Sequence, residues 1–239
     1  MRVLNYVKFV FTVFFLGSFA VMGLASCSND ESEVIENENP LLNASITFKY
    51  DGSVYSYEMD NGELKCDDRT KSVIDFLWNC DDLVTYIHDD GSIEYFMSEE
   101  DCKDAIFWER PELALSSVSR ATEKERYYVT LRIYENAKYK GANRFYERIG
   151  NGIITLGDLT TLGWGITSFK LNFINSLPPL LNETGVRFYA EKNLSGESIG
   201  YTTKGEKAIS NFTSVPLRPG SSENWNDRVK SLKFGAGVY

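Results

Sequence analysis

Hydrophobic and polar residues alternate in several short runs over the second half of the chain. Val129, Leu131 and Ile133 alternate with polar residues, and similar runs lie at 166–173 and 229–234. A period of two is typical of strands that bury one face. Turn residues separate the runs at regular short spacings, and this pattern favours a β-sandwich over residues 127–239.

The preceding region, residues 45–108, contains two signals for β-hairpins. Apolar residues alternate on both sides of the pair Asp51-Gly52, and the pair Asp90-Gly91 divides two further apolar runs. An Asp-Gly pair between alternating runs is a strong signal for a tight hairpin turn. We therefore expect two hairpins in this region.

The same region also carries two helix signals. Apolar residues recur at helical spacing over 73–80, and Ser98 precedes three acidic residues, as in a helix N-cap. Pro111 should end the helix that follows. We expect a small α+β domain at 45–108 and a polar linker at 109–126.

The first 26 residues have the layout of a secretory signal peptide. Arg2 and Lys8 precede an apolar run from Phe9 to Leu24, and small residues follow. The run is short for a transmembrane helix, which needs roughly 20 apolar residues. We expect residues 1–26 to be removed from the mature protein.

The end of this segment, Leu24-Ala25-Ser26-Cys27, resembles the lipobox of bacterial lipoproteins, in which the cysteine is acylated and becomes the first mature residue. The resemblance implies a lipid anchor at Cys27 in the outer membrane, because Ser rather than Asp follows the cysteine. An ordinary secretory cleavage that leaves a free thiol is the alternative. The next, acidic residues resemble the surface-export signal of Bacteroidetes lipoproteins. Both the periplasmic and the cell-surface face stay open.

Residues 27–44 are polar and acidic, so we expect a disordered tether. The net charge of the chain is −9, which disfavours nucleic acid as a partner because nucleic acid requires a basic face. A glycan or a protein remains a candidate partner. Cys66, Cys80 and Cys102 allow one disulfide of undetermined pairing, and their spacing does not indicate a zinc cluster.

One spacing occurs twice in the C-terminal region: an aromatic residue, four residues, an aromatic residue, one residue and a glycine. The positions are Tyr134, Tyr139 and Gly141, then Tyr189, Leu194 and Gly196, with leucine as the second aromatic of the second copy. This spacing resembles the Greek-key signature of βγ-crystallins, and a closing strand follows each copy. The resemblance implies a mainly β protein, with a double Greek-key sandwich at 127–239 preceded by the small α+β domain.

Calcium-binding members of that family carry two Asn/Asp residues, two variable residues, Ser/Thr and Ser before each closing strand. In the second copy Asn226 and Asp227 fit this pattern, and Ser231 fits again. Lys230 takes the place of the hydroxyl ligand. An ammonium group donates hydrogen bonds and accepts none, so it cannot ligate a cation.

In the first copy, Gly163 and Trp164 replace the Asn/Asp pair, while Thr167 and Ser168 keep the hydroxyls. Three outcomes follow. Both sites are lost and the domain is structural, or one weak calcium site of roughly 0.1–1 mM survives, or the loops act without metal. The surviving site would consist of Thr167 with the Asn226-Asp227 pair, and Lys230 would then pair with Asp227 or point to solvent.

Signals for catalysis are sparse. His88 is the single histidine, and it lies beside two aspartates in a predicted hairpin. The chain has neither a nucleophile elbow nor a phosphate-binding glycine loop. Pairs of acidic residues occur, but nothing in the sequence places two of them across a cleft, as a glycosidase requires. We therefore expect a non-catalytic protein.

The expected function is that of an envelope lipoprotein with a binding or structural role. The first alternative is a protease inhibitor of crystallin-like fold, with an exposed loop at 174–185 that contains Pro178 and Pro179. The second alternative is an enzyme with an unrecognised site in the N-terminal domain. That reading requires a cleft lined by His88 and several acids.

Overall fold

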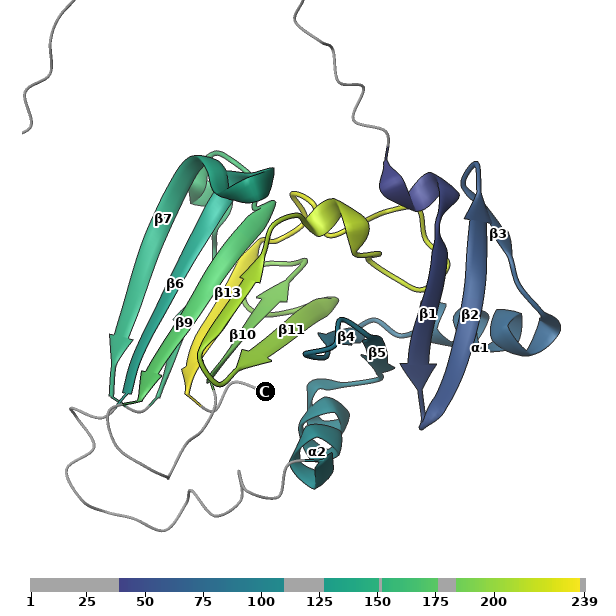
Figure 1. Cartoon of the computed structure of the whole chain (residues 1–239), viewed down its shortest axis with the longest axis horizontal. Coiled ribbons are helices and arrows are strands. Elements are labelled where there is room, and N and C mark those ends of the chain that lie inside the picture. The colour runs from purple at the N-terminus through teal and green to yellow at the C-terminus, as the bar shows by residue number, and fades with distance from the viewer. Residues whose placement is uncertain (1–38, 110–126, 151, 176–183, 237–239) are drawn as a thin grey trace, which may run out of the picture. The chain divides into compact units, whose positions relative to one another are not determined.

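The computed structural model describes residues 39–109, 127–150, 152–175 and 184–236 (Figure 1). These residues form thirteen strands in two sheets and two α-helices. The predicted signal peptide, the anchor at Cys27, most of the linker and the centre of the candidate inhibitor loop lie outside the described residues. None of the described helices is long and apolar enough to span a bilayer.

The N-terminal region consists of a short 3-10 turn, five strands and two helices. The 3-10 turn is Pro40–Asn43, the strands are β1 (Ser45–Tyr50), β2 (Ser53–Asp60), β3 (Glu63–Lys65), β4 (Val84–Ile87) and β5 (Ile93–Phe96), and the helices are α1 (Asp68–Trp78) and α2 (Glu99–Glu109).

Both predicted hairpins are present. β1 and β2 pair antiparallel around Asp51 and Gly52, whose φ angles of 47° and 69° are those of a type I′ turn. β4 and β5 pair antiparallel on either side of Asp90-Gly91. The Asp-Gly pairs therefore predicted these two turns correctly.

The two helices begin at side-chain caps. A carboxylate oxygen of Asp67 accepts a hydrogen bond from the backbone N–H of Thr70 at 2.6 Å, and α1 follows directly. The hydroxyl oxygen of Ser98 accepts from the backbone N–H of Asp101 at 3.1 Å, as the predicted N-cap of α2 requires. Helix α1 buries Ile74 against the N-terminal sheet, where Phe48 lies in the same core.

The C-terminal region contributes eight strands. They are β6 (Tyr127–Asn136), β7 (Lys140–Ile149), β8 (Ile153–Leu156), β9 (Ser168–Asn175), β10 (Thr184–Tyr189), β11 (Ser198–Thr203), β12 (Glu206–Ile209) and β13 (Ser231–Ala236). Short 3-10 turns at Ala137–Tyr139, Thr160–Leu162 and Phe212–Ser214 connect some of them.

These eight strands form two interlocked Greek keys. One sheet has the order β12-β9-β6-β7, and the order β11-β10-β13-β8 continues the other sheet. The third strand of each key, β8 or β12, pairs in the sheet of the opposite key. Figure 1 shows β7, β6 and β9 side by side in one layer and β13, β10 and β11 in the next. The predicted mainly β fold with a crystallin-like double Greek-key sandwich is confirmed.

The core of the sandwich is aromatic. The rings of Phe169, Phe188, Tyr201 and Phe212 are buried and in mutual contact, with centroids 5.0 to 6.5 Å apart. Val129, Leu131 and Ile133, the alternating residues of β6, point into this core and are fully buried. The alternation in the sequence thus predicted the correct face of β6.

The N-terminal region and the Greek keys share one sheet. β4 pairs parallel with β11, with Val84 opposite Ser198, so that the sheet order is β3-β2-β1-β5-β4-β11-β10-β13-β8. The sequence suggested two domains, 45–108 and 127–239, joined by a linker. The structure instead places Glu38–Tyr239 in one compact unit. Parallel pairing of distant strands leaves no local signal, which explains the difference.

The predicted tether extends to residue 44, whereas its last residues belong to the folded unit. Leu41 is only 2% exposed. The amide of Asn39 donates a hydrogen bond to the carbonyl oxygen of Ser222 at 2.6 Å. A soluble fragment should therefore begin at Glu38 rather than at Ser45.

Candidate functional site

The first Greek-key signature forms a folded-over hairpin between β6 and β7. The rings of Tyr134 and Tyr139 are in edge-to-face contact, with centroids 5.6 Å apart. Gly141 has φ 76°, and a Cβ at this position would lie 2.4 Å from the side-chain nitrogen of Asn136. The hydroxyl of Ser168 accepts from the backbone N–H of Tyr139 and donates to the carbonyl oxygen of Asn136. The closing strand β9 thus holds the hairpin in place.

The second signature repeats this geometry. Gly196 has φ 72°, close to that of its counterpart in the first copy. The hydroxyl of Ser231 in β13 accepts from the backbone N–H of Leu194 at 2.9 Å and donates to the carbonyl oxygen of Glu191 at 2.6 Å. The substitution of leucine for the second aromatic residue therefore leaves the folded-over hairpin intact.

The three residues of the predicted surviving calcium site meet across the two loops. The hydroxyl of Thr167 donates to the side-chain oxygen of Asn226 at 2.6 Å, and the amide of Asn226 donates to a carboxylate oxygen of Asp227 at 2.9 Å. The backbone N–H of Asp227 donates to the carbonyl oxygen of Ile166 at 3.3 Å. A threonine and an Asn-Asp pair that lie about sixty residues apart in the chain thus form one cluster of oxygens.

Gly165 makes room for this cluster. A Cβ at Gly165 would lie 2.1 Å from a carboxylate oxygen of Asp227, so the carboxylate packs directly against the glycine backbone. Gly165 occupies a variable position of the first copy, directly after Gly163 and Trp164, and its lack of a side chain accommodates Asp227 of the second copy. Nothing in the sequence pattern pointed to this role.

Lys230 lies in the other half of the loop pair. Its ammonium group binds both carboxylate oxygens of Glu191, at 2.9 and 3.0 Å. The expected pairing of Lys230 with Asp227 is therefore wrong, and the side chain of Lys230 is 41% exposed. Its partner is Glu191, because the backbone N–H of Lys230 donates to the carbonyl oxygen of Tyr189 at 2.9 Å and so places Lys230 beside the hairpin that contains Glu191.

A second ion pair lies beside the first. Asp158 accepts hydrogen bonds from the hydroxyl and the backbone N–H of Thr160 and pairs with Lys192 at 2.9 Å. The hydrogen bond from the Thr160 hydroxyl, together with Lys192, lowers the pKa of Asp158 to about 2. Asp158 and Glu191 each have a lysine as counter-ion, so this half of the loop pair offers no uncompensated acid to a cation.

The N-terminus of α2 forms a further charged cluster that the sequence did not reveal. Lys233 donates to both carboxylate oxygens of Glu99, at 2.8 and 3.0 Å, and the hydroxyl of Tyr189 also donates to this carboxylate. Arg187, 1% exposed, places its Nε 3.7 Å from the same group. Burial would raise the pKa of Glu99, but the hydrogen bonds from Lys233 and Tyr189 and the Arg187 charge outweigh it and lower that pKa.

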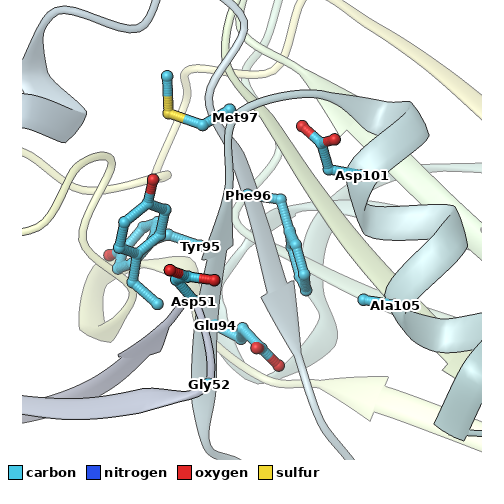
Figure 2. Close-up of a pocket in the computed structure, with 9 residues that line it drawn as sticks. Asp51, Gly52, Glu94, Tyr95, Phe96, Met97, Asp101 and Ala105 are labelled. Atoms are coloured by element: carbon cyan, nitrogen blue, oxygen red, sulfur yellow. The ribbon is translucent and has the colours of Figure 1, made fainter.

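A pocket of about 490 Å³ lies between the β1–β2 turn, β5 and α2 (Figure 2). Figure 2 shows Asp51, Glu94 and Asp101 among the side chains that line it, and none of its lining residues is basic. His88 does not line the pocket, although its Nε2 lies 2.7 Å from a carboxylate oxygen of Glu94. The cleft that the enzyme alternative requires is thus only partly formed.

Other candidate groups offer little for metal or redox chemistry. The described residues contain no group of three His, Cys, Asp or Glu side chains that could hold a metal ion. Cys66, Cys80 and Cys102 are free thiols, and burial raises the pKa of each. The loop proposed for protease inhibition cannot be placed, because residues 176–183 lie outside the described ones.

No protein-family profile matches the chain, and no curated protein matches it. Among solved structures, the chain is similar to a crystallised mutant of a βγ-crystallin domain from Clostridium beijerinckii. The likeness has 23% sequence identity and a TM-score of 0.25, and covers 44% of this chain and 97% of that domain. The strand order β12-β9-β6-β7 and β11-β10-β13-β8 itself defines the double Greek key.

Proposed function

We propose that this protein is a non-catalytic envelope lipoprotein, anchored through Cys27, whose Greek-key region acts as a binding module with one weak calcium site. The observation that carries the proposal is the meeting of Thr167, Asn226 and Asp227 across the two loops. This ligand set combines a hydroxyl, an amide oxygen and a carboxylate, which are all groups that calcium accepts.

The residues fit calcium as a partial ligand set. Calcium takes six to eight oxygens, and a site with a single carboxylate lies at the weak end, at roughly 0.1–1 mM, as in extracellular modules. Thr167, Asn226 and Asp227 would hold the ion, and the ion would supply a positive charge that links the two loops. Lys230 does not interfere, because its charge is compensated by Glu191 on the other half of the loop pair.

Calorimetry tests the calcium site. Calcium chloride is titrated into the fragment Glu38–Tyr239, which contains every described element, after treatment with EDTA and dialysis. We expect saturable binding at submillimolar to millimolar calcium. Asp227→Asn should abolish it, since asparagine tolerates the positive φ of 57° at this position but lacks the charge. Lys230→Gln should leave it unchanged. The absence of saturable heat in the unsubstituted fragment would refute the site.

The anchor is tested separately in cells. If Cys27 is acylated, the full chain should incorporate labelled palmitate and fractionate with membranes. Cys27→Ser should lose both properties. Incorporation of label into Cys27→Ser would exclude this cysteine as the anchor, whatever the outcome of the calcium titration.

A further inference from the structure

A second pocket, of about 350 Å³, lies where the C-terminus of α1 meets the loop between residues 216 and 224. Its walls include Trp78 from α1, Glu197, and Arg218, Ser222 and Glu223 from the loop. The volume is at the low end of the range for small-molecule sites. Four separate parts of the chain contribute to it: the end of α1, the segment before β11 that contains Glu197, the loop itself, and the β2–β3 turn with Gly62.

Trp78 lines this pocket and stays partly exposed. The residue is 49% exposed, although tryptophan usually buries most of its surface. Its indole N–H donates a hydrogen bond to the carbonyl oxygen of Pro219 at 2.8 Å. The polar atom of the ring is therefore satisfied by the protein and the ring is fixed. The part that remains exposed can offer only apolar and π contacts to a ligand.

Arg218 links two walls of the pocket, the segment of Glu197 and the C-terminus of α1. Its Nε and Nη2 donate to one carboxylate oxygen of Glu197 at 2.8 and 2.6 Å. Its Nη1 donates to the carbonyl oxygens of Leu77, Trp78 and Cys80 at 2.9 to 3.4 Å, and so caps the C-terminus of α1. A pocket whose walls are fixed in this way loses little entropy when a ligand binds.

The charges of the pocket are compensated within the protein. Glu197 pairs with Arg218 at 2.6 Å, and Glu223 pairs with Arg228 at 2.8 Å. An ionised carboxylate has about four acceptor positions, so both groups can still accept hydrogen bonds from a ligand. These carboxylates would repel an anionic ligand, and the lining residues include no unpaired cation to offset the repulsion. A neutral ligand that donates hydrogen bonds meets no such penalty.

We propose that this pocket binds a neutral pyranose unit of an oligosaccharide. A pyranose ring has one face of C–H groups, which packs on an aromatic ring, and a rim of hydroxyls, which donate to carboxylate and serine oxygens. Trp78 supplies the flat face, and Glu197, Glu223 and Ser222 supply the rim. The inference extends the proposed binding role by naming a ligand class, and it is independent of the calcium site.

The test is ligand-observed NMR on the fragment Glu38–Tyr239 in EDTA, with a panel of neutral trisaccharides: maltotriose, cellotriose, mannotriose and N,N′,N″-triacetylchitotriose. Trigalacturonic acid serves as the anionic comparison. At least one neutral trisaccharide should show saturable binding that is tighter than that of the acid. Trp78→Ala should weaken it on the order of tenfold or more, as is typical for an aromatic anchor.

Two further variants separate loss of the binding face from loss of local structure. Phe76→Ala removes another half-exposed aromatic residue of α1, which does not line the pocket, and should leave binding unchanged. Trp78→Phe keeps a flat ring without the N–H and should retain most of the affinity. The proposal is overturned if no neutral trisaccharide binds, if Trp78→Ala binds as well as the unsubstituted protein, or if trigalacturonic acid binds equally tightly. Because EDTA is present, none of these results bears on calcium.

Discussion

Glu99 joins the N-terminus of α2 to the Greek keys through Arg187, Lys233 and Tyr189. It supplies the carboxylate nearest to Arg187, whose guanidinium is buried and cannot lose its proton. Lys233, itself mostly buried, pairs with the same carboxylate. A buried cation that loses its counter-ion is strongly destabilising, even where the intact pair contributes little.

Replacement of Glu99 by glutamine should therefore lower the free energy of unfolding by about 3 kcal/mol at pH 7. The native pKa of Glu99 is lowered, so its contribution is fully present above the usual glutamate value of 4.5 and is lost as the pH falls through the native pKa. Urea unfolding between pH 7 and pH 3 should show the two proteins converging below pH 4.5. Glu100→Gln, at the exposed neighbouring position, is the control. Equal stabilities at pH 7 would contradict this role.

Among the elements, the geometry of the folded-over hairpins explains why the Greek-key signature could predict them from the sequence. Tyr134, Tyr139 and Gly141 could be recognised from their spacing, since the hairpin demands an aromatic contact and a positive φ at fixed positions. The stabilisation of these hairpins by Ser168 and Ser231 was harder to recognise from the sequence. In the sequence these serines belonged to a calcium pattern, whereas in the structure their hydroxyls bridge the hairpin backbone.

Ser231→Ala should destabilise the protein by about 1–3 kcal/mol, because the backbone N–H of Leu194 and the carbonyl of Glu191 lose a shared buried partner. Thermal unfolding of Glu38–Tyr239 measures the effect. Ser195→Ala, in the exposed part of the same hairpin, removes a hydroxyl that bonds only to Lys192 among the described contacts, and should change the stability by a few tenths of a kcal/mol. A similar loss of stability in Ser231→Ala and Ser195→Ala would show that the hydrogen bonds of the Ser231 hydroxyl do not specifically stabilise the hairpin.

At the scale of the whole molecule, the sequence predicted elements better than their assembly. Alternation, Asp-Gly pairs and caps identified local structures such as the β1–β2 hairpin and α1. The parallel pairing of β4 with β11 joins residues more than one hundred positions apart, and no local period encodes it. The partners of Lys230 and Glu99 were equally hidden, because both depend on strand order. By contrast, Thr167 could be assigned to the cluster with Asn226 and Asp227, because the resemblance implied that the two loops meet.

The shared sheet predicts cooperative unfolding. β11 is buried along its whole length between β4 and β10, and Arg218 ties α1 to the Greek keys. Scanning calorimetry of Glu38–Tyr239 should therefore show one transition, with equal calorimetric and van't Hoff enthalpies. Two resolved transitions would show that the N-terminal region and the Greek keys are independent domains, as the sequence alone suggested.

The most direct test of the central claim is a calcium titration of the ¹⁵N-labelled fragment Glu38–Tyr239, followed by amide chemical shifts. We expect saturable shifts at Thr167, Asn226 and Asp227, while the amides of Glu191 and Lys230 change little, since their charges are already paired. Asp227→Asn should remove these shifts without altering the rest of the spectrum. An unchanged spectrum at high millimolar calcium, or shifts centred on Lys230, would show that Thr167, Asn226 and Asp227 do not form a calcium site.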